Sequence, residues 1–187
     1  MKAFTYSLAA TALMANSASA FFAKQAAATP PMPTITPNPV IKVAASGMNL
    51  LKPLFVAEAN IQAAVLGAVT SVDKDAVAAQ LADAKKNNKV LIYTYGLSPF
   101  SSEALSILNT SEYEYTNIKL GEEWFLLGGE GSEMRVALSK EVDSGATSLP
   151  KIFIGGECIG GCSELAALVE NGELEGMMNN AKVSRRK

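Results

Sequence analysis

A run of ten residues near the C-terminal end constrains the fold of this chain more than any other feature. Residues 150–159 read Pro-Lys-Ile-Phe-Ile-Gly-Gly-Glu-Cys-Ile, two short apolar stretches on either side of a glycine pair. This pattern predicts a hairpin of strands 152–154 and 157–159, with a tight turn at the two glycines. A hairpin contributes antiparallel pairing, so the sheet that contains it is not purely parallel.

The residues around the hairpin alternate between helical and extended patterns. Asp73 can cap a helix that runs to about Asn87, and Pro99 suits the first turn of a second helix that runs to about Asn109. The other expected elements are strands over 90–94 and 113–120 and helices over 132–142, 163–170 and 173–179. The order α-β-α-β-α-β-β-α-α predicts a small α/β layer fold with a mixed sheet.

The N-terminal part has the pattern of a targeting leader. Residues 1–20 combine Lys2, an alanine-rich apolar run and the small residues of Ala18-Ser19-Ala20, which predicts a signal peptide cleaved after Ala20. The apolar run is too short for a permanent membrane span. Residues 21–47 are a Pro/Ala-rich, transit-like linker, and the first acidic residue of the whole chain is Glu58.

A signal peptide followed by an acid-poor segment that begins with Phe21 resembles the two-part leaders of algae with complex, red-lineage plastids. That resemblance implies that the protein enters the secretory route and continues to a complex plastid. Secretion, or residence in an endomembrane lumen, is the alternative.

Three further segments complete the expected organisation. Residues 48–71 form a helical extension, residues 72–182 a domain, and residues 183–187 a basic tail. The extension is expected to turn one apolar face to the domain. That face would be formed by Leu51, Leu54, Phe55, Ile61, Val65 and Val69.

Charge and composition exclude several functions. Sixteen basic and eighteen acidic residues leave a net charge of −2, which gives no electrostatic reason to bind nucleic acid. The chain has no histidine, so it cannot use a Ser-His-Asp or Cys-His mechanism or a histidine metal site. Its two cysteines, Cys158 and Cys162, are too few for a disulfide framework or a structural zinc site. No metal site is expected.

Residues 72–182 resemble the glutaredoxin family, which has the thioredoxin fold. The most specific match is 149–162, Leu-Pro-Lys-Ile-Phe-Ile-Gly-Gly-Glu-Cys-Ile-Gly-Gly-Cys. The resemblance implies an α/β, thioredoxin-like three-layer fold with a four-stranded mixed sheet flanked by helices. Other matching segments are 89–93, 98–101, 132–138, 148–150 and 159–163.

The turn at 98–101 departs from the family pattern. It reads Ser-Pro-Phe-Ser, where glutaredoxins carry Cys-Pro-Tyr-Cys or Cys-Gly-Phe-Ser. Ser98 therefore stands at the position of the family nucleophile, and a hydroxyl cannot form a mixed disulfide. Ser98 is also a favoured N-cap before Pro99, which explains it without chemistry. An iron–sulfur cluster is not expected, because its cysteine ligand would be Ser98.

The resemblance implies a glutathione site. It would be formed by Ser98, Pro99 and Phe100 on one side, by Arg135, and by Leu149, Pro150, Gly161, Cys162 and Ser163 on the other. Pro150 matches the family's cis-proline, and Arg135 could reach the glycyl carboxylate. The family's lysine position holds Tyr95, so glutathione binding is expected to be weakened.

Cys162 is the remaining candidate for a reactive thiol. It is expected at the N-terminus of a helix, where the pKa of a thiol falls. Cys158 lies in a predicted strand and suits a small apolar residue. Residues 122–130 form a longer loop than is usual in the family, with the only tryptophan, and are a candidate protein contact that could equally pack on the core.

Two functions therefore stay open. The chain is a glutathione-dependent thiol–disulfide oxidoreductase that is weak or inactive because Ser98 replaces the nucleophile, or it is a non-catalytic module that binds glutathione or senses redox state through Cys162. Its partner is glutathione or a thiol of another protein. A serine-type glutathione transferase is not expected, because such enzymes need a large helical second domain and only about sixteen residues follow Asn171.

Overall fold

The structure, a computed structural model, describes residues 32–41, 44, 56–61, 63–65, 72–123 and 127–186. All of them except Met32 belong to one compact unit, Pro33–Lys187. The predicted signal peptide and most of the predicted linker lie outside the described residues. In the part of the chain that is described, no helix is both long and apolar enough to cross a membrane.

A four-stranded mixed sheet forms the centre of the domain, with the strand order β2-β1-β3-β4. The strands are β1 (Val90–Tyr95), β2 (Thr116–Gly121), β3 (Lys151–Ile154) and β4 (Glu157–Gly160). β1 pairs in parallel with β2 and antiparallel with β3, and β3 pairs antiparallel with β4. The predicted hairpin is confirmed, and so is the mixed sheet.

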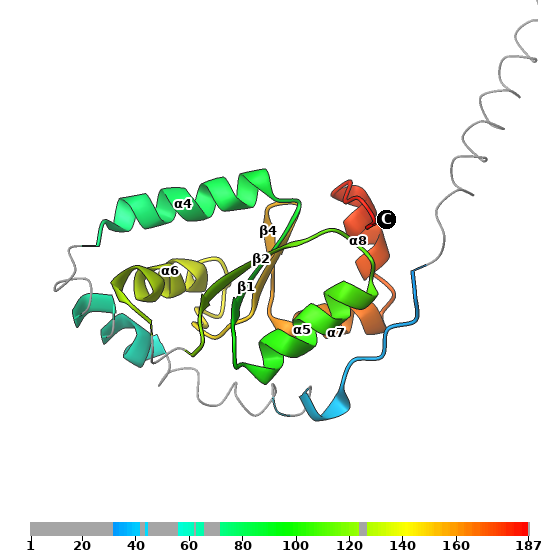
Figure 1. Cartoon of the computed structure of the whole chain (residues 1–187), viewed down its shortest axis with the longest axis horizontal. Helices are drawn as coiled ribbons and strands as arrows, with labels where there is room; N and C mark the ends of the chain where they lie inside the picture. Colours follow the sequence, from blue (N-terminus) through cyan, green and yellow to red (C-terminus); the bar gives the residue numbers. More distant parts are fainter. Residues whose placement is uncertain are drawn as a thin grey trace, which may run out of the picture. The chain divides into compact units, whose positions relative to one another are not determined.

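Helices cover both faces of this sheet (Figure 1). The two helices α4 (Lys74–Asn87) and α6 (Gly129–Ser139) pack together on one face, and α5 (Pro99–Thr110) and α7 (Cys162–Glu170) pack together on the other. A last short helix, α8 (Leu174–Asn180), follows α7. This is the predicted three-layer arrangement.

Local sequence explains where the helices begin. The Asp73 carboxylate accepts hydrogen bonds from the backbone N–H groups of Asp75 and Ala76, as expected of a helix N-cap. Every residue of β1 is buried, because this strand lies inside the sheet and between two helix layers. The core against α4 and α6 is built from Val77, Leu81, Leu91, Tyr93, Tyr95, Leu127, Met134, Leu138, Leu149 and Phe153.

The second strand and the tail differ from expectation. β2 begins at Thr116, whereas the sequence pattern predicted a strand from Tyr113. Tyr113 instead forms an isolated antiparallel bridge with Arg185. The guanidinium of Arg185 lies over the Tyr113 ring at 5.1 Å, and Val183 is buried. The end of the chain is therefore held against the domain by backbone pairing and by cation–π contact.

The helical extension also differs in the face it buries. Its described residues, 56–61 and 63–65, are helical. Ala59 and Ala63 are buried, whereas Ile61 and Val65 are 64% and 57% exposed. The predicted apolar face is therefore wrong for these two positions. Glu58, next to Ala59, forms an ion pair with Arg135 of the domain, so the side of the helix that faces the domain carries this carboxylate and small side chains.

Candidate functional site

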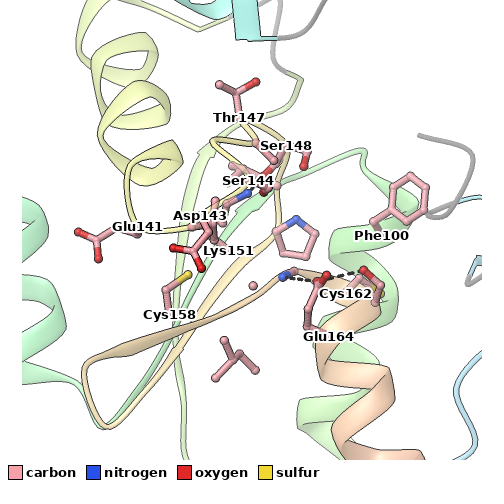
Figure 2. A pocket seen from close by; sticks show the side chains of 18 residues that line it. Phe100, Glu141, Asp143, Ser144, Thr147, Ser148, Lys151, Cys158, Cys162 and Glu164 are labelled. Carbon is pink, nitrogen blue, oxygen red and sulfur yellow. Dashed lines mark hydrogen bonds between the residues drawn. The ribbon is translucent and has the colours of Figure 1, made fainter. Parts of the chain in front are cut away.

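A groove with a volume of about 510 Å³ opens between the residues that precede β3 and the start of α7 (Figure 2). Phe100 of α5 lines one side of it, and Cys158 of β4 lines the lower end. Of the sequence-predicted residues, the groove is lined by Phe100, Leu149, Pro150, Gly161, Cys162 and Ser163. The structure thus brings together six predicted residues from three segments of the sequence, at 100, 149–150 and 161–163.

The peptide bond between Leu149 and Pro150 is cis, as the family resemblance implied. Among the described residues, the backbone N–H and C=O of Leu149 form no hydrogen bond. The start of α7 approaches closely, since a Cβ at Gly161 would lie only 3.0 Å from the Pro150 carbonyl oxygen. An unpaired backbone edge in a groove is suited to an extended peptide ligand.

Ser98 acts as the N-cap of α5. Its Oγ accepts a hydrogen bond from the backbone N–H of Ser101 at 3.3 Å, and its side chain is buried. The Oγ of Ser101 in turn accepts from the backbone N–H of Tyr95 at 3.2 Å. Neither Ser98 nor Pro99 lines the groove. The hydroxyl oxygens of Ser98 and Ser101 therefore both accept hydrogen bonds from backbone N–H groups.

The α7 N-terminus carries a residue that sequence reasoning missed. The carboxylate of Glu164 accepts hydrogen bonds from the Gly161 N–H at 2.8 Å and from the Ser163 hydroxyl at 3.0 Å. Burial acts to raise the pKa of the Glu164 carboxyl, but these donors outweigh it and the pKa lies below 4.5. Only the glutamate half of a capping box is present, because Gly161 has no side chain, but a glutamate three residues after the N-cap could have revealed this role.

The thiol of Cys162 is not activated. Burial, followed by the nearby carboxylates of Glu103 and Glu164, raises the pKa of Cys162 to about 11. The expectation that the helix N-terminus lowers this pKa is therefore wrong, because desolvation and two negative charges outweigh the helix dipole. Residues ahead of the domain add to the burial, since Pro37 and Ile41 line a small hollow together with Cys162. Burial also raises the pKa of the half-buried Cys158.

Arg135 lies behind the groove wall rather than in the groove. Its side chain is 2% exposed, and its Nη1 lies 2.8 Å from Oε2 of Glu58. Its Nε donates to the Thr147 carbonyl at 3.1 Å, and its Nη2 donates to the Thr147 hydroxyl at 3.3 Å. The expected free approach of Arg135 to a ligand carboxylate is thus not seen, because an internal carboxylate holds the guanidinium.

Two further expectations concern the rim of the site. The aromatic residues of the 122–130 loop, at positions 124 and 125, lie outside the described residues. Where the chain is described, no group of three or more carboxylate, thiol or imidazole side chains is placed to hold a metal ion.

The chain is similar to curated glutaredoxins. No protein-family profile matches it. It is 32% identical over 92 residues to a protein described as "Probable glutaredoxin" from Synechocystis, of which it covers 94%. It is 34% identical over 94 residues to "Monothiol glutaredoxin-S12, chloroplastic" from Arabidopsis thaliana. The chain spans 49% of the length of that relative, and 60% of the monothiol glutaredoxin matched in Caenorhabditis elegans.

Solved structures give the same result. Oxidized glutaredoxin 2 from Chlamydomonas reinhardtii superposes with a TM-score of 0.50 at 28% identity, over 59% of this chain and 98% of that one. A buckwheat glutaredoxin, solved as a complex with glutathione, has a TM-score of 0.52 at 20% identity, over 58% of this chain and 93% of that one, and shows the fold alone. The sequence match that covers nearly all of the Synechocystis protein shows the relationship: the chain belongs to the glutaredoxin family.

Proposed function

We propose that this protein is a binding module on a glutaredoxin fold, which holds glutathione or a closely related thiol peptide in its groove and has little or no disulfide reductase activity. The observation that carries this proposal is the burial of the Ser98 side chain and its hydrogen bond to the backbone of α5. Its hydroxyl stands at the family's nucleophile position, is buried, and caps α5.

Disulfide exchange needs a thiolate that attacks a sulfur atom. A serine hydroxyl becomes a nucleophile only with an adjacent general base, and this chain has no histidine. Two other hydroxyls are hydrogen-bonded at this turn: that of Ser101 accepts from the backbone N–H of Tyr95, and that of Ser102 donates to the backbone carbonyl of Ser98. The described α5 N-terminus therefore offers hydrogen bonds, but no group that could carry the reaction.

Cys162 does not replace the missing nucleophile. With a pKa of about 11, its thiolate fraction at pH 7 is about one in ten thousand. This also disfavours the alternative in which Cys162 senses redox state, because such sensors need an accessible, low-pKa thiol. A slow side reaction of Cys162 is all that this environment supports.

The groove residues fit a glutathione-like ligand. The unpaired backbone of Leu149 can pair with the peptide backbone of the ligand, and Phe100 offers an apolar wall. The α7 N-terminus provides backbone donors and a positive dipole end for a carboxylate, and the Glu164 carboxylate can receive an ammonium group. The glutathione complex of the buckwheat glutaredoxin supports this proposal.

For the cellular location we propose delivery through the secretory route to a complex plastid. The signal-peptide pattern of residues 1–20 and the acid-poor segment that follows support this. Expression of residues 1–47 fused to a fluorescent protein in an alga with such plastids tests it. Fluorescence inside the plastid is expected, and fluorescence in the medium or the endomembrane lumen would contradict the proposal.

Binding is tested by calorimetric titration of the full chain with S-methylglutathione, whose blocked sulfur rules out redox chemistry. Phe100→Ala should weaken binding at least severalfold, because the ring lines the groove. Leu97→Ala is the matched control, since Leu97 is 68% exposed and lies outside the groove. Absence of binding to the wild-type protein, or equal effects of the two substitutions, would overturn the proposal.

A further inference from the structure

The described part of the helical extension reaches the domain beside the groove. Thr147 connects the two places. It lines the groove at the end away from Cys158, and it accepts two hydrogen bonds from Arg135. Arg135 also forms an ion pair with the carboxylate of Glu58 at 2.8 Å. The carboxylate of Glu58, which belongs to the extension, is therefore bound to Arg135, and Arg135 in turn contacts the groove residue Thr147.

The side chain of Tyr95 also suits a carboxylate ligand near Arg135, because within the described part of the chain its hydroxyl is a free hydrogen-bond donor. Tyr95, at the end of β1, is 6% exposed, and its hydroxyl has no hydrogen-bond partner among the described residues. Burial raises the pKa of this phenol to about 12, and the charges of Arg135, Glu58 and Glu123 act on it to a smaller extent. A buried hydroxyl without a partner is unfavourable, and a carboxylate seated here differently from that of Glu58 could accept a hydrogen bond from it.

Resting on the proposed function, we propose that Glu58 is an internal competitor for the groove: its carboxylate occupies the Arg135 guanidinium that the C-terminal carboxylate of a bound glutathione-like peptide would otherwise take. The extension thereby lowers the affinity of the groove for anionic ligands. Release of residues 56–65 from the domain exposes Arg135 beside Thr147 and completes the site.

The described contacts of the extension suit a part that can be displaced. Among the described residues of this segment, only the small side chains of Ala59 and Ala63 are buried, whereas Ile61 and Val65 are exposed. Two alanines bury little apolar area, so the ion pair is the strongest described attachment. A ligand that must displace such a segment binds with an affinity reduced by the fraction of molecules in which the site is open.

Calorimetric titration of the full chain with S-methylglutathione and with its C-terminal amide tests this. Glu58→Gln should raise the affinity for S-methylglutathione on the order of tenfold, because the amide competes poorly for Arg135. The same substitution should leave the affinity for the amide ligand unchanged, since that ligand has no carboxylate to place there. Glu114→Gln is the matched control, because it removes one negative charge from an exposed residue away from the groove.

A second measurement does not depend on the substitution. Saturating S-methylglutathione should increase amide hydrogen exchange in residues 56–65 of the wild-type protein, because the ligand displaces them. Unchanged or slower exchange in this segment would refute the competitor role of Glu58. An equal increase in affinity for S-methylglutathione and for its C-terminal amide in Glu58→Gln would refute it as well. If the wild type binds S-methylglutathione and Glu58→Gln binds it no more tightly, the competitor role fails while the proposed function stands. If neither protein binds, both fail.

Discussion

The hydroxyl oxygen of Ser98 accepts a hydrogen bond from the backbone N–H of Ser101, 3.3 Å away, at the first turn of α5. This contact gives Ser98 a structural role, and under the proposed function Ser98 stands at the position where the family carries its attacking sulfur. The fold around it is preserved, including the cis bond before Pro150 and the groove between β3 and α7. Under the proposed function, the protein keeps a groove for glutathione and lacks the sulfur atom that performs exchange.

Glu164 stabilises the start of α7. Glu164→Ala should lower the free energy of unfolding by about 1 kcal/mol, because it removes the acceptor for the Gly161 N–H and the Ser163 hydroxyl. Glu164→Gln keeps an acceptor and should lose less. Urea denaturation measures both, and equal losses would show that hydrogen bonding is not the cause.

The same residue makes stability depend on acid. The pKa of the Glu164 carboxyl is lowered in the folded protein. Its contribution is therefore complete above about pH 4.5, the value in the unfolded chain, and is lost as the pH falls through the lower folded pKa. Denaturation of wild type and Glu164→Gln between pH 6 and the acid limit of folding should show the two curves converging at low pH. Parallel curves would contradict this.

Cys162 should make the free energy of unfolding fall as the pH rises into the alkaline range. Its pKa rises from 9.0 to about 11 on folding, so the unfolded chain loses this proton first. The stabilisation is complete below pH 9 and is lost as the pH rises toward 11. Cys162→Ala should therefore show a shallower fall in stability over this interval than the wild type. An unchanged slope would mean that the thiol is not held neutral.

Arg135 should matter for stability more than its place on a helix suggests. Arg135→Met leaves Glu58 and both Thr147 acceptors without their partner, and should lower the free energy of unfolding by about 3 kcal/mol. Lys140→Met, at an exposed position just after α6, is the control and should change it by less than about 0.5 kcal/mol. Similar losses in the two variants would refute the role of the buried guanidinium.

Much of the fold could be predicted because local signals agree with it. The signals that place α4, α5 and the hairpin involve only residues close together in the sequence, so their spacing is enough to predict these elements. They are the N-caps Asp73 and Ser98 and the Gly155-Gly156 turn. The cis-proline came from resemblance to the family. β2 was predicted three residues too long, because Tyr113 pairs with Arg185 at the far end of the chain.

The electrostatics of the site could not be predicted in this way. The pKa of Cys162 depends on its burial and on Glu103 of α5, and the position of Arg135 depends on Glu58 of the extension. These partners come from elements separated in the sequence, and only the packed structure brings them together. Resemblance to the family gave the residues that line the groove, but not the internal carboxylates that surround them.

The central claim is that one missing sulfur atom separates this protein from the family's disulfide reductases. Glutathione-dependent reduction of a small disulfide should be compared for the wild type, Ser98→Cys and Ser101→Cys. Activity should be at background for the wild type and rise at least about tenfold in Ser98→Cys, where a thiol would stand at a helix N-terminus. Ser101→Cys should stay at background, because that side chain is only 1% exposed and is directed to the backbone N–H of Tyr95 in β1, whereas Ser98 stands at the N-cap of α5. A wild-type rate equal to that of Ser98→Cys would contradict the account.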